Sequence, residues 1–72
     1  MRVKIHLDTM KEVQHFVDAA QQVLEPVYIS DGHGLRVSAK SLLGAIYALE
    51  FDELWCETKN DIFHLIRPFM VD

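Results

Sequence analysis

The sequence predicts an α+β fold in two layers, with helices packed on one face of a β-sheet. Two patterns indicate this fold: apolar residues alternate with polar ones in short segments, and elsewhere they recur at three- and four-residue spacing. A turn with two glycines joins two of the alternating segments, as in a β-hairpin. The chain has 72 residues, of which 50% are hydrophobic, and this suits one small domain over residues 1–72.

The first strand and the first helix are predicted from the N-terminal third. Residues 2–7 alternate apolar and polar side chains, which predicts a strand. Thr9 followed by Glu12 fits a capping box, in which each side chain satisfies a free backbone N–H at a helix start. The helix then has an apolar side formed by Val13, Phe16, Val17, Ala20 and Leu24. Pro26 closes it, because proline disfavours helical geometry in the residue before it.

A hairpin, a second helix and a fourth strand follow. Residues 27–39 alternate on either side of Asp31-Gly32-His33-Gly34, where glycine permits the positive φ of a tight turn. Ser41 stands before the mostly apolar stretch 42–49 and is expected to be the N-cap of a short helix. Residues 54–58 are expected to form the fourth strand.

A last helix completes the pattern. Asn60 or Asp61 can cap it, and Pro68 limits or kinks it. Its inward residues are expected to be Ile62, Phe63, Ile66 and Phe69. The resulting order, β-α-β-β-α-β-α, fits a ferredoxin-like split βαβ domain as well as other two-layer α+β folds.

Charge and hydropathy argue against several classes of protein. The net charge is −4, and five carboxylates face one lysine between residues 50 and 61, a run that either is solvated or steers a basic partner. No cationic cluster occurs along the chain, so we do not expect nucleic acid as a partner. The longest apolar run, 42–49, is far short of the roughly 20 residues that span a bilayer. The first residues turn polar too early for a secretory signal, which predicts a cytoplasmic protein without membrane attachment.

One cysteine and four histidines raise the question of metal or redox chemistry. Cys56 has no disulfide partner within the chain, and beside Trp55 in a strand it is expected to be a buried core thiol. The histidines show no zinc-site spacing, and His33 is expected to be a polar residue of the hairpin turn. We therefore expect no metal and no cofactor.

The stretch Lys40–Leu49, which begins Lys-Ser-Leu-Leu-Gly, resembles the Lys-Ser-Ile-Met-Gly segment of HPr. HPr is the phosphocarrier of the bacterial phosphoenolpyruvate sugar phosphotransferase system. The resemblance extends over nearly the whole chain, because the hairpin before this segment, the strand after it and the closing helix fall where HPr has them. It implies an open-faced two-layer sandwich, in which three helices cover one face of a four-stranded antiparallel sheet.

The phosphoacceptor signature of HPr is degenerate in this chain. HPr carries phosphate on the histidine of a Gly-Ile/Leu-His-Ala-Arg-Pro signature, and the matching segment here is Leu7-Asp8-Thr9-Met10-Lys11-Glu12. Thr9 stands at the position of the histidine, Lys11 at that of the arginine and Glu12 at that of the proline. His15 lies about two turns into the helix, too far from its first N–H groups to replace the acceptor. We expect neither phosphocarrier nor enzymatic activity.

A second phosphorylation chemistry of the family fits the sequence better. In HPr of Gram-positive bacteria and in catabolite-repression HPr, HPr kinase/phosphorylase phosphorylates the serine of Lys-Ser, and the product binds a transcriptional repressor. Ser41 matches this serine, so the resemblance implies a regulatory, protein-binding module that is switched there. The docking face of the family implies five partner-binding residues: Lys11, Lys40, Leu42, Leu43 and Tyr47.

Four alternatives stay open. The chain could be an active phosphocarrier with an unrecognised acceptor, or a ferredoxin-like domain that binds a ligand or dimerises. Ser41 could serve only as an N-cap. The apolar second helix either is deeply packed or presents an apolar surface to a partner.

Overall fold

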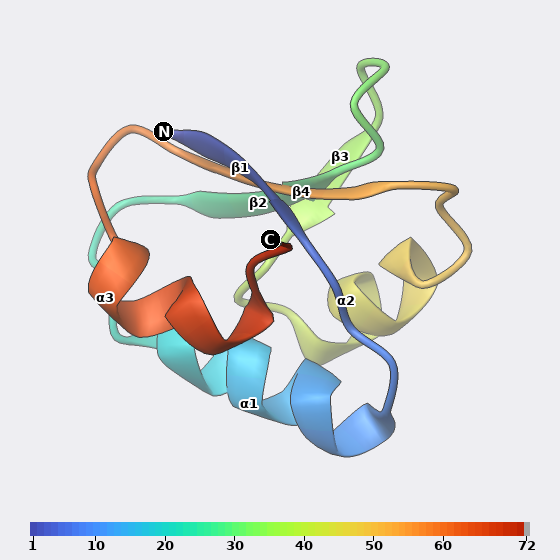
Figure 1. Cartoon of the computed structure of the whole chain (residues 1–72), viewed down its shortest axis with the longest axis horizontal. Helices are drawn as coiled ribbons and strands as arrows, with labels where there is room; N and C mark the ends of the chain where they lie inside the picture. Colours follow the sequence, from blue (N-terminus) through green and yellow to red (C-terminus); the bar gives the residue numbers. More distant parts are fainter. Residues whose placement is uncertain (72) are drawn as a thin grey trace.

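The computed structural model describes residues 1–71 and contains the predicted elements in the predicted order. The strands are β1 (Arg2–Ile5), β2 (Val27–Ser30), β3 (Arg36–Ser38) and β4 (Leu54–Thr58). The helices are α1 (Met10–Gln21), α2 (Leu42–Ala48) and α3 (Phe63–Ile66), and a short 3₁₀ helix, η1 (Arg67–Phe69), follows α3. The strands form one antiparallel sheet, and all three α-helices lie on the same side of it (Figure 1). The predicted open-faced two-layer α+β sandwich is confirmed.

The strand order is β1-β4-β2-β3, which places β1 at an edge of the sheet. A ferredoxin-like sheet has its first strand in the interior, so the sheet order does not fit that alternative. The outer edge of β1 is covered by the end of η1 and the residues that follow it, because the His6 N–H donates to the Phe69 carbonyl at 2.8 Å and the Val71 N–H donates to the Lys4 carbonyl at 3.1 Å. Covering this edge satisfies backbone groups that would otherwise be open to another strand.

The predicted capping box at the start of α1 is confirmed. The Thr9 hydroxyl accepts from the Glu12 N–H at 3.1 Å, and the Glu12 carboxylate accepts from the Thr9 N–H at 3.1 Å. The prediction that Leu24 faces the core is wrong, since α1 ends at Gln21 and Leu24 is 97% exposed beyond its last turn. No helix within residues 1–71 combines the length and the apolar character needed to cross a membrane.

The hairpin between β2 and β3 turns on the predicted loop. The Asp31 carboxylate accepts from the His33 N–H at 2.7 Å and from the Leu35 N–H at 3.1 Å, which tightens the turn. Gly32 and Gly34 have φ values of 84° and 104°, a region in which glycine avoids the strain of a side chain. The loop stands out from the sheet at the top of Figure 1.

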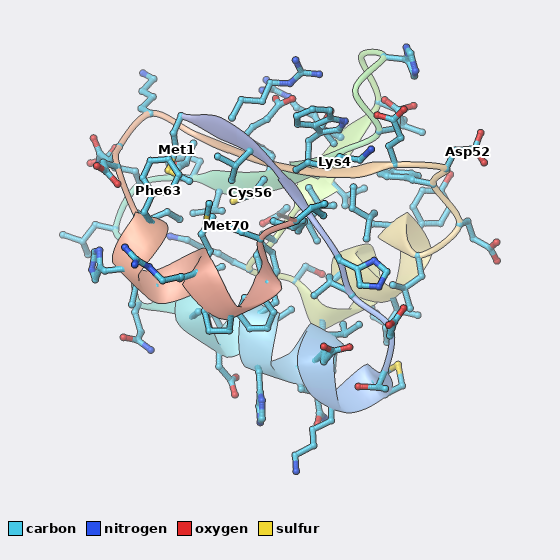
Figure 2. All side chains as sticks on the ribbon, in the orientation of Figure 1. Met1, Lys4, Asp52, Cys56, Phe63 and Met70 are labelled. Atoms are coloured by element: carbon cyan, nitrogen blue, oxygen red, sulfur yellow. The ribbon has the colours of Figure 1, made fainter. Side chains whose placement is uncertain are left out.

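The core lies between the sheet and the helices. Its largest fully buried side chains are Phe16, Ile29, Ile66, Val13, Val27 and Cys56. The rings of Phe16 in α1 and Phe69 in η1 meet edge to face, with centroids 5.3 Å apart. Cys56 points from β4 toward the helices, as Figure 2 shows, so the predicted core thiol is confirmed.

The C-terminal helix is shorter than a full amphipathic helix. Its N-cap is Ile62, and Asp61 contributes its carboxylate to the Phe63 N–H at 3.0 Å from one position upstream. The α-helix ends at Ile66, and Pro68 lies in the 3₁₀ helix that follows, in line with its predicted effect. The expected inward residues are buried, except Phe63, which is half-buried.

Candidate functional site

Helix α2 turns alanines to the core and large apolar side chains to solvent. Ala45 and Ala48 are fully buried, whereas Leu43 is 80% exposed and Tyr47 is 55% exposed. Of the two interpretations of this apolar helix, exposure favours the outward-facing one. We call its four exposed side chains the α2 surface: Leu42, Leu43, Tyr47 and Leu49. Leu43 and Tyr47 lie one helical turn apart, and large exposed apolar side chains that lie close together are a usual mark of a contact with another molecule.

Ser41 is the N-cap of α2, as predicted. Its hydroxyl accepts from the Gly44 N–H at 3.1 Å, and the residue is exposed. The Lys40 ammonium donates to the Val23 carbonyl just past α1, and the Lys40 carbonyl accepts from the Gln21 side chain at 3.1 Å. Lys40 thus links the start of α2 to the end of α1, and its ammonium is engaged in this contact.

The two predicted docking lysines do not form one basic patch. Lys11 is exposed in the first turn of α1, whereas the Lys40 ammonium sits at Val23. At 1.5 Å per residue, the helix from Lys11 to its end at Gln21 is about 15 Å long. Lys11 therefore belongs to the head of α1, and Lys40 belongs to the opposite end.

At the head of α1, where the resemblance puts a phosphate, the Glu12 carboxylate already accepts hydrogen bonds from the backbone. The Glu12 carboxylate accepts from the backbone N–H groups of Asp8 at 2.8 Å and of Thr9 at 3.1 Å. The Thr9 hydroxyl is engaged in the capping box. A phosphate at Thr9 would have to displace Glu12 and would meet the Asp8 carboxylate nearby.

A histidine that the sequence did not single out lies beside this head. His6 Nε2 is 2.9 Å from the Asp8 carboxylate, and both side chains are 67% exposed. The signal available in the sequence is the spacing, since residues two apart in an extended segment project to the same side. His15, by contrast, lines a shallow hollow of about 370 Å³ between α1 and Leu42.

The remaining candidate groups have structural roles or are simply exposed. Burial raises the pKa of the Cys56 thiol from its ordinary 9.0 to about 11, so the reactive thiolate is disfavoured. His33 is exposed in the hairpin loop. Over residues 1–71, no three His, Cys, Asp or Glu side chains converge in a way that could hold a metal ion.

The acidic run does not form one continuous surface. Glu53 accepts from the Trp55 indole N–H at 2.9 Å, Glu57 pairs with Arg2 at 3.2 Å, and Asp61 accepts from a backbone N–H of α3. These contacts fix three of the five carboxylates within the fold. The run therefore offers less of a steering surface than its sequence suggests.

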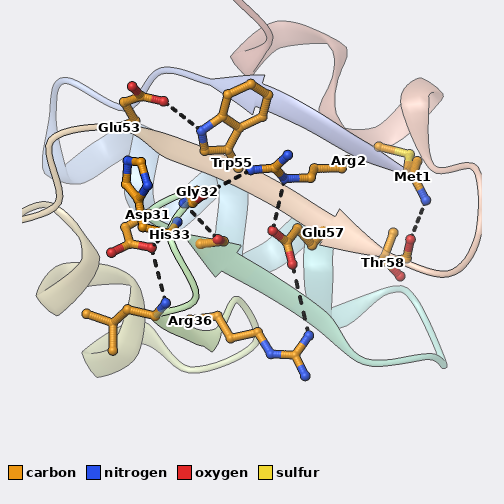
Figure 3. Close-up of polar contacts among 12 residues, drawn as sticks. Met1, Arg2, Asp31, Gly32, His33, Arg36, Glu53, Trp55, Glu57 and Thr58 are labelled. Atoms are coloured by element: carbon orange, nitrogen blue, oxygen red, sulfur yellow. Dashed lines mark hydrogen bonds and ion pairs between the residues drawn. The ribbon is translucent and has the colours of Figure 1, made fainter.

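The helix-free face of the sheet carries a cluster that the sequence analysis missed. The Arg2 guanidinium carbon lies over the Trp55 ring at 4.5 Å from its centroid, and that of Arg36 lies over the Tyr28 ring at 4.3 Å. Glu57 stands between the two guanidinium groups, 3.2 Å from Arg2 and 4.0 Å from Arg36 (Figure 3).

This cluster corrects the inference, drawn from the order of residues along the chain, that the protein has no cationic cluster. The cations are dispersed along the chain, but strand pairing sets Arg2 opposite Glu57 and Glu57 opposite Tyr28, so they gather on one face. The signal that could have found them is the set of outward positions in the predicted strands. Those positions hold Arg2, Lys4, Tyr28, Arg36, Trp55 and Glu57.

Comparison with known proteins gives no family assignment. The chain matches no family model, and no curated protein or solved structure gives a significant match. The resemblance to HPr rests on the residues from Lys40 to Leu49 and on the order of the elements.

Proposed function

We propose that this protein is an HPr-like regulatory module of the bacterial cytoplasm, related to the sugar phosphotransferase system, that binds a partner protein through the α2 surface. It is not an enzyme and does not carry phosphate on a histidine. The observation that carries the proposal is the outward orientation of Leu43 and Tyr47 in α2, whose core contacts are made by Ala45, Ile46 and Ala48. Tyr47 packs edge to face on Phe51, with ring centroids 5.9 Å apart, but folding alone gives no reason for a leucine at the 80% exposed position 43.

The size of the α2 surface suits a transient complex with a different protein. Burying one leucine side chain contributes about 1.5 to 3 kcal/mol to the free energy of binding, so a partner that covers Leu43 and its neighbours stabilises the complex. A helix of seven residues is about 10 Å long, too short to supply the roughly 800 Å² per partner of a stable dimer. We expect the α2 surface to bind an apolar groove or an apolar helix of a regulatory partner protein.

The structure of the α1 head supports the absence of carrier activity. The Glu12 carboxylate accepts from the N–H groups of Asp8 and Thr9 just before the helix, and the Thr9 hydroxyl is used by the capping box. A phosphothreonine ester would in any case lack the transfer potential of a phosphoimidazole. This leaves regulation through binding as the role that suits the scaffold.

Phosphorylation at Ser41 is the proposed switch, and it rests on the resemblance to HPr. The hydroxyl is exposed and directly precedes Leu42 and Leu43. A phosphate of about −2 charge there would change the affinity of an apolar surface for its partner. The resemblance implies that the partner is HPr kinase/phosphorylase or a transcriptional repressor.

The modification is tested by intact mass with phosphopeptide mapping after two parallel incubations. One contains ATP and HPr kinase/phosphorylase, and the other contains phosphoenolpyruvate and enzyme I. We expect a single phosphate from ATP, lost in Ser41→Ala, and none from phosphoenolpyruvate. Phosphate on another residue, or no reaction with ATP, would remove the proposed switch.

The docking surface is tested separately by calorimetry with HPr kinase/phosphorylase and with the repressor. Leu43→Asp should weaken binding at least tenfold, because it places a charge in the buried centre of the contact. Leu24→Asp is the matched control, since Leu24 is also an exposed leucine but lies outside the α2 surface. Equal effects of the two substitutions, or binding by neither partner protein, would contradict the proposal.

A second candidate function is favoured by the contact between His6 and Asp8. If Nε2 donates to the carboxylate, Nδ1 keeps its lone pair and could take a phosphoryl group from a phosphohistidine donor. His6 would then be the unrecognised acceptor of an active phosphocarrier. Acid-labile phosphate transferred from phosphoenolpyruvate through enzyme I, and lost in His6→Ala, would establish this function in place of the first.

A further inference from the structure

The open face of the sheet contains a hollow of about 460 Å³ at the end where β4 leaves the sheet. We call it the open-face hollow and define it by the side chains on which the argument depends: Arg2, Pro26, Tyr28, Arg36, Glu57 and Lys59. Its volume falls within the range of small-molecule sites, roughly 300 to 1,000 Å³. Its residues Arg2, Arg36 and Glu57 project from the face of the sheet opposite the helices, so the hollow is separate from the α2 surface (Figure 3).

The charge of the hollow is opposite to that of the protein. Three of its side chains are cationic and one is a carboxylate, whereas the whole chain carries −4. Glu57 touches both guanidinium groups, yet one carboxylate neutralises only one of them. The hollow therefore attracts anions, although the protein as a whole repels them.

The two arginines are held in position before any ligand arrives. Each guanidinium lies over an aromatic ring, and both approach the same carboxylate. Their side chains are 51% and 55% exposed, so N–H donors remain open to solvent, while the Glu57 side chain is only 25% exposed. A guanidinium presents five donors in a planar fork that matches the oxygens of a phosphate.

The other side chains of the hollow indicate which groups the ligand carries besides its phosphate. Tyr28 and Pro26 supply apolar surface, and planar bases stack readily on tyrosine rings and on guanidinium planes. The Glu57 carboxylate only accepts hydrogen bonds, so it favours a ligand that brings hydroxyl or amino donors in addition to its phosphate. A nucleotide combines a phosphate, hydroxyl groups and a planar base.

We propose that the open-face hollow binds a nucleoside monophosphate. The phosphate is held by Arg36 and Lys59, because the Glu57 carboxylate already accepts from Arg2 Nε at 3.2 Å but lies 4.0 Å from Arg36. The base lies against Tyr28 and Pro26. This site does not depend on the proposed function of α2, because it uses none of the same residues.

The probe for this proposal is AMP, titrated into the whole chain by calorimetry and by amide-shift NMR. We expect saturable binding, with shifts confined to β1, β2, β3 and the end of β4. Arg36→Gln should weaken binding at least tenfold, because it removes a charge-assisted fork to the phosphate. Lys4→Gln is the matched control: it removes one positive charge from the same face but outside the hollow, and it should change the affinity less than about twofold.

Adenosine and inorganic phosphate are titrated separately to test the nucleoside and the phosphate parts of AMP. Each should bind at least tenfold more weakly than AMP. Lys59→Gln provides a second variant in case Arg36→Gln alters folding, which thermal unfolding will show. Absence of saturable binding at millimolar AMP would overturn the proposal. An equal loss of AMP affinity in Lys4→Gln and Arg36→Gln would show that the binding is non-specific charge attraction. Much tighter binding of a single-stranded oligonucleotide than of AMP would show that the hollow binds an oligonucleotide instead of a mononucleotide.

Discussion

Replacing Ser41 with alanine should lower the free energy of unfolding by about 1 kcal/mol. The substitution removes the acceptor of the Gly44 N–H, which lies 3.1 Å from the serine oxygen. Because Ser41 is exposed, water can take over part of this role and no cavity forms, so the loss stays near the middle of the range of about 0.5 to 2 kcal/mol known for caps. In a domain of this size, 1 kcal/mol corresponds to a fall in Tm of about 4 to 8 °C.

Ser41→Asp is the comparison that separates capping from regulation. The aspartate keeps an oxygen for the Gly44 N–H and adds a negative charge at the positive end of the helix. We expect its stability to remain within about 0.5 kcal/mol of that of the parent chain. If Ser41 is a switch, this variant changes partner affinity at unchanged stability.

The assay is thermal and urea unfolding followed by circular dichroism, with hydrogen exchange at the Gly44 amide. In Ser41→Ala, exchange at Gly44 should accelerate together with the fall in Tm. An unchanged Tm and unchanged exchange would show that the cap contact contributes nothing. A Ser41→Asp variant as unstable as Ser41→Ala would refute the electrostatic part of the reasoning.

Three further predictions concern stability, each measured by urea unfolding. Glu12→Ala should cost about 1 kcal/mol, since it frees two backbone N–H groups at the head of α1, and Glu12→Gln should cost less. The pKa of Cys56 is about 11 in the fold and ordinarily 9.0, so the unfolded chain loses the thiol proton at lower pH than the folded one. The free energy of unfolding should therefore be constant in this respect below pH 9 and should fall by about 2 to 3 kcal/mol between pH 9 and 11. Cys56→Ala should lack this pH-dependent fall. Gly32→Ala should cost about 1 to 2 kcal/mol, because its Cβ would lie 2.8 Å from the Trp55 indole nitrogen at φ 84°, whereas Gly34→Ala meets open space and should cost less.

Local signals predicted the elements of this fold well. The capping box at Thr9, the cap at Ser41 and the strand at residues 54–58 depend on neighbours in sequence, and all three occur where predicted. The inward position of Leu24 was predicted from helical spacing alone. It failed because spacing does not reveal that α1 ends at Gln21, before Pro26 is reached.

The orientation of α2 could not be predicted, because its large apolar residues surround most of the helix. The structure resolves this by placing Ala45 and Ala48 against the core, where small side chains allow close approach. The role of Lys40 was likewise hidden, since its contact with Val23 joins residues that only the tertiary fold brings together.

The open-face cluster was missed for a similar reason. Arg2, Arg36 and Lys59 are far apart in sequence, and only the order β1-β4-β2-β3 brings them to one hollow. A search along the chain for runs of cations cannot detect such a group. A search restricted to the outward positions of the predicted strands would have found the cations Arg2, Lys4 and Arg36 beside two aromatic rings, although not Lys59, which lies just after β4.

Both surfaces are independent of the residues that hold the fold together. The buried core contains neither the exposed leucines of α2 nor the arginines of the open face. Substitutions at either surface therefore leave most of the folding energy untouched. The sheet separates the two surfaces, yet β3 passes directly into α2, where the Ser41 N–H donates to the Ser38 carbonyl at 3.3 Å. A ligand held by Arg36 and a phosphate on Ser41 would thus act on the two ends of one short segment, which is the shortest physical route by which either site could influence the other.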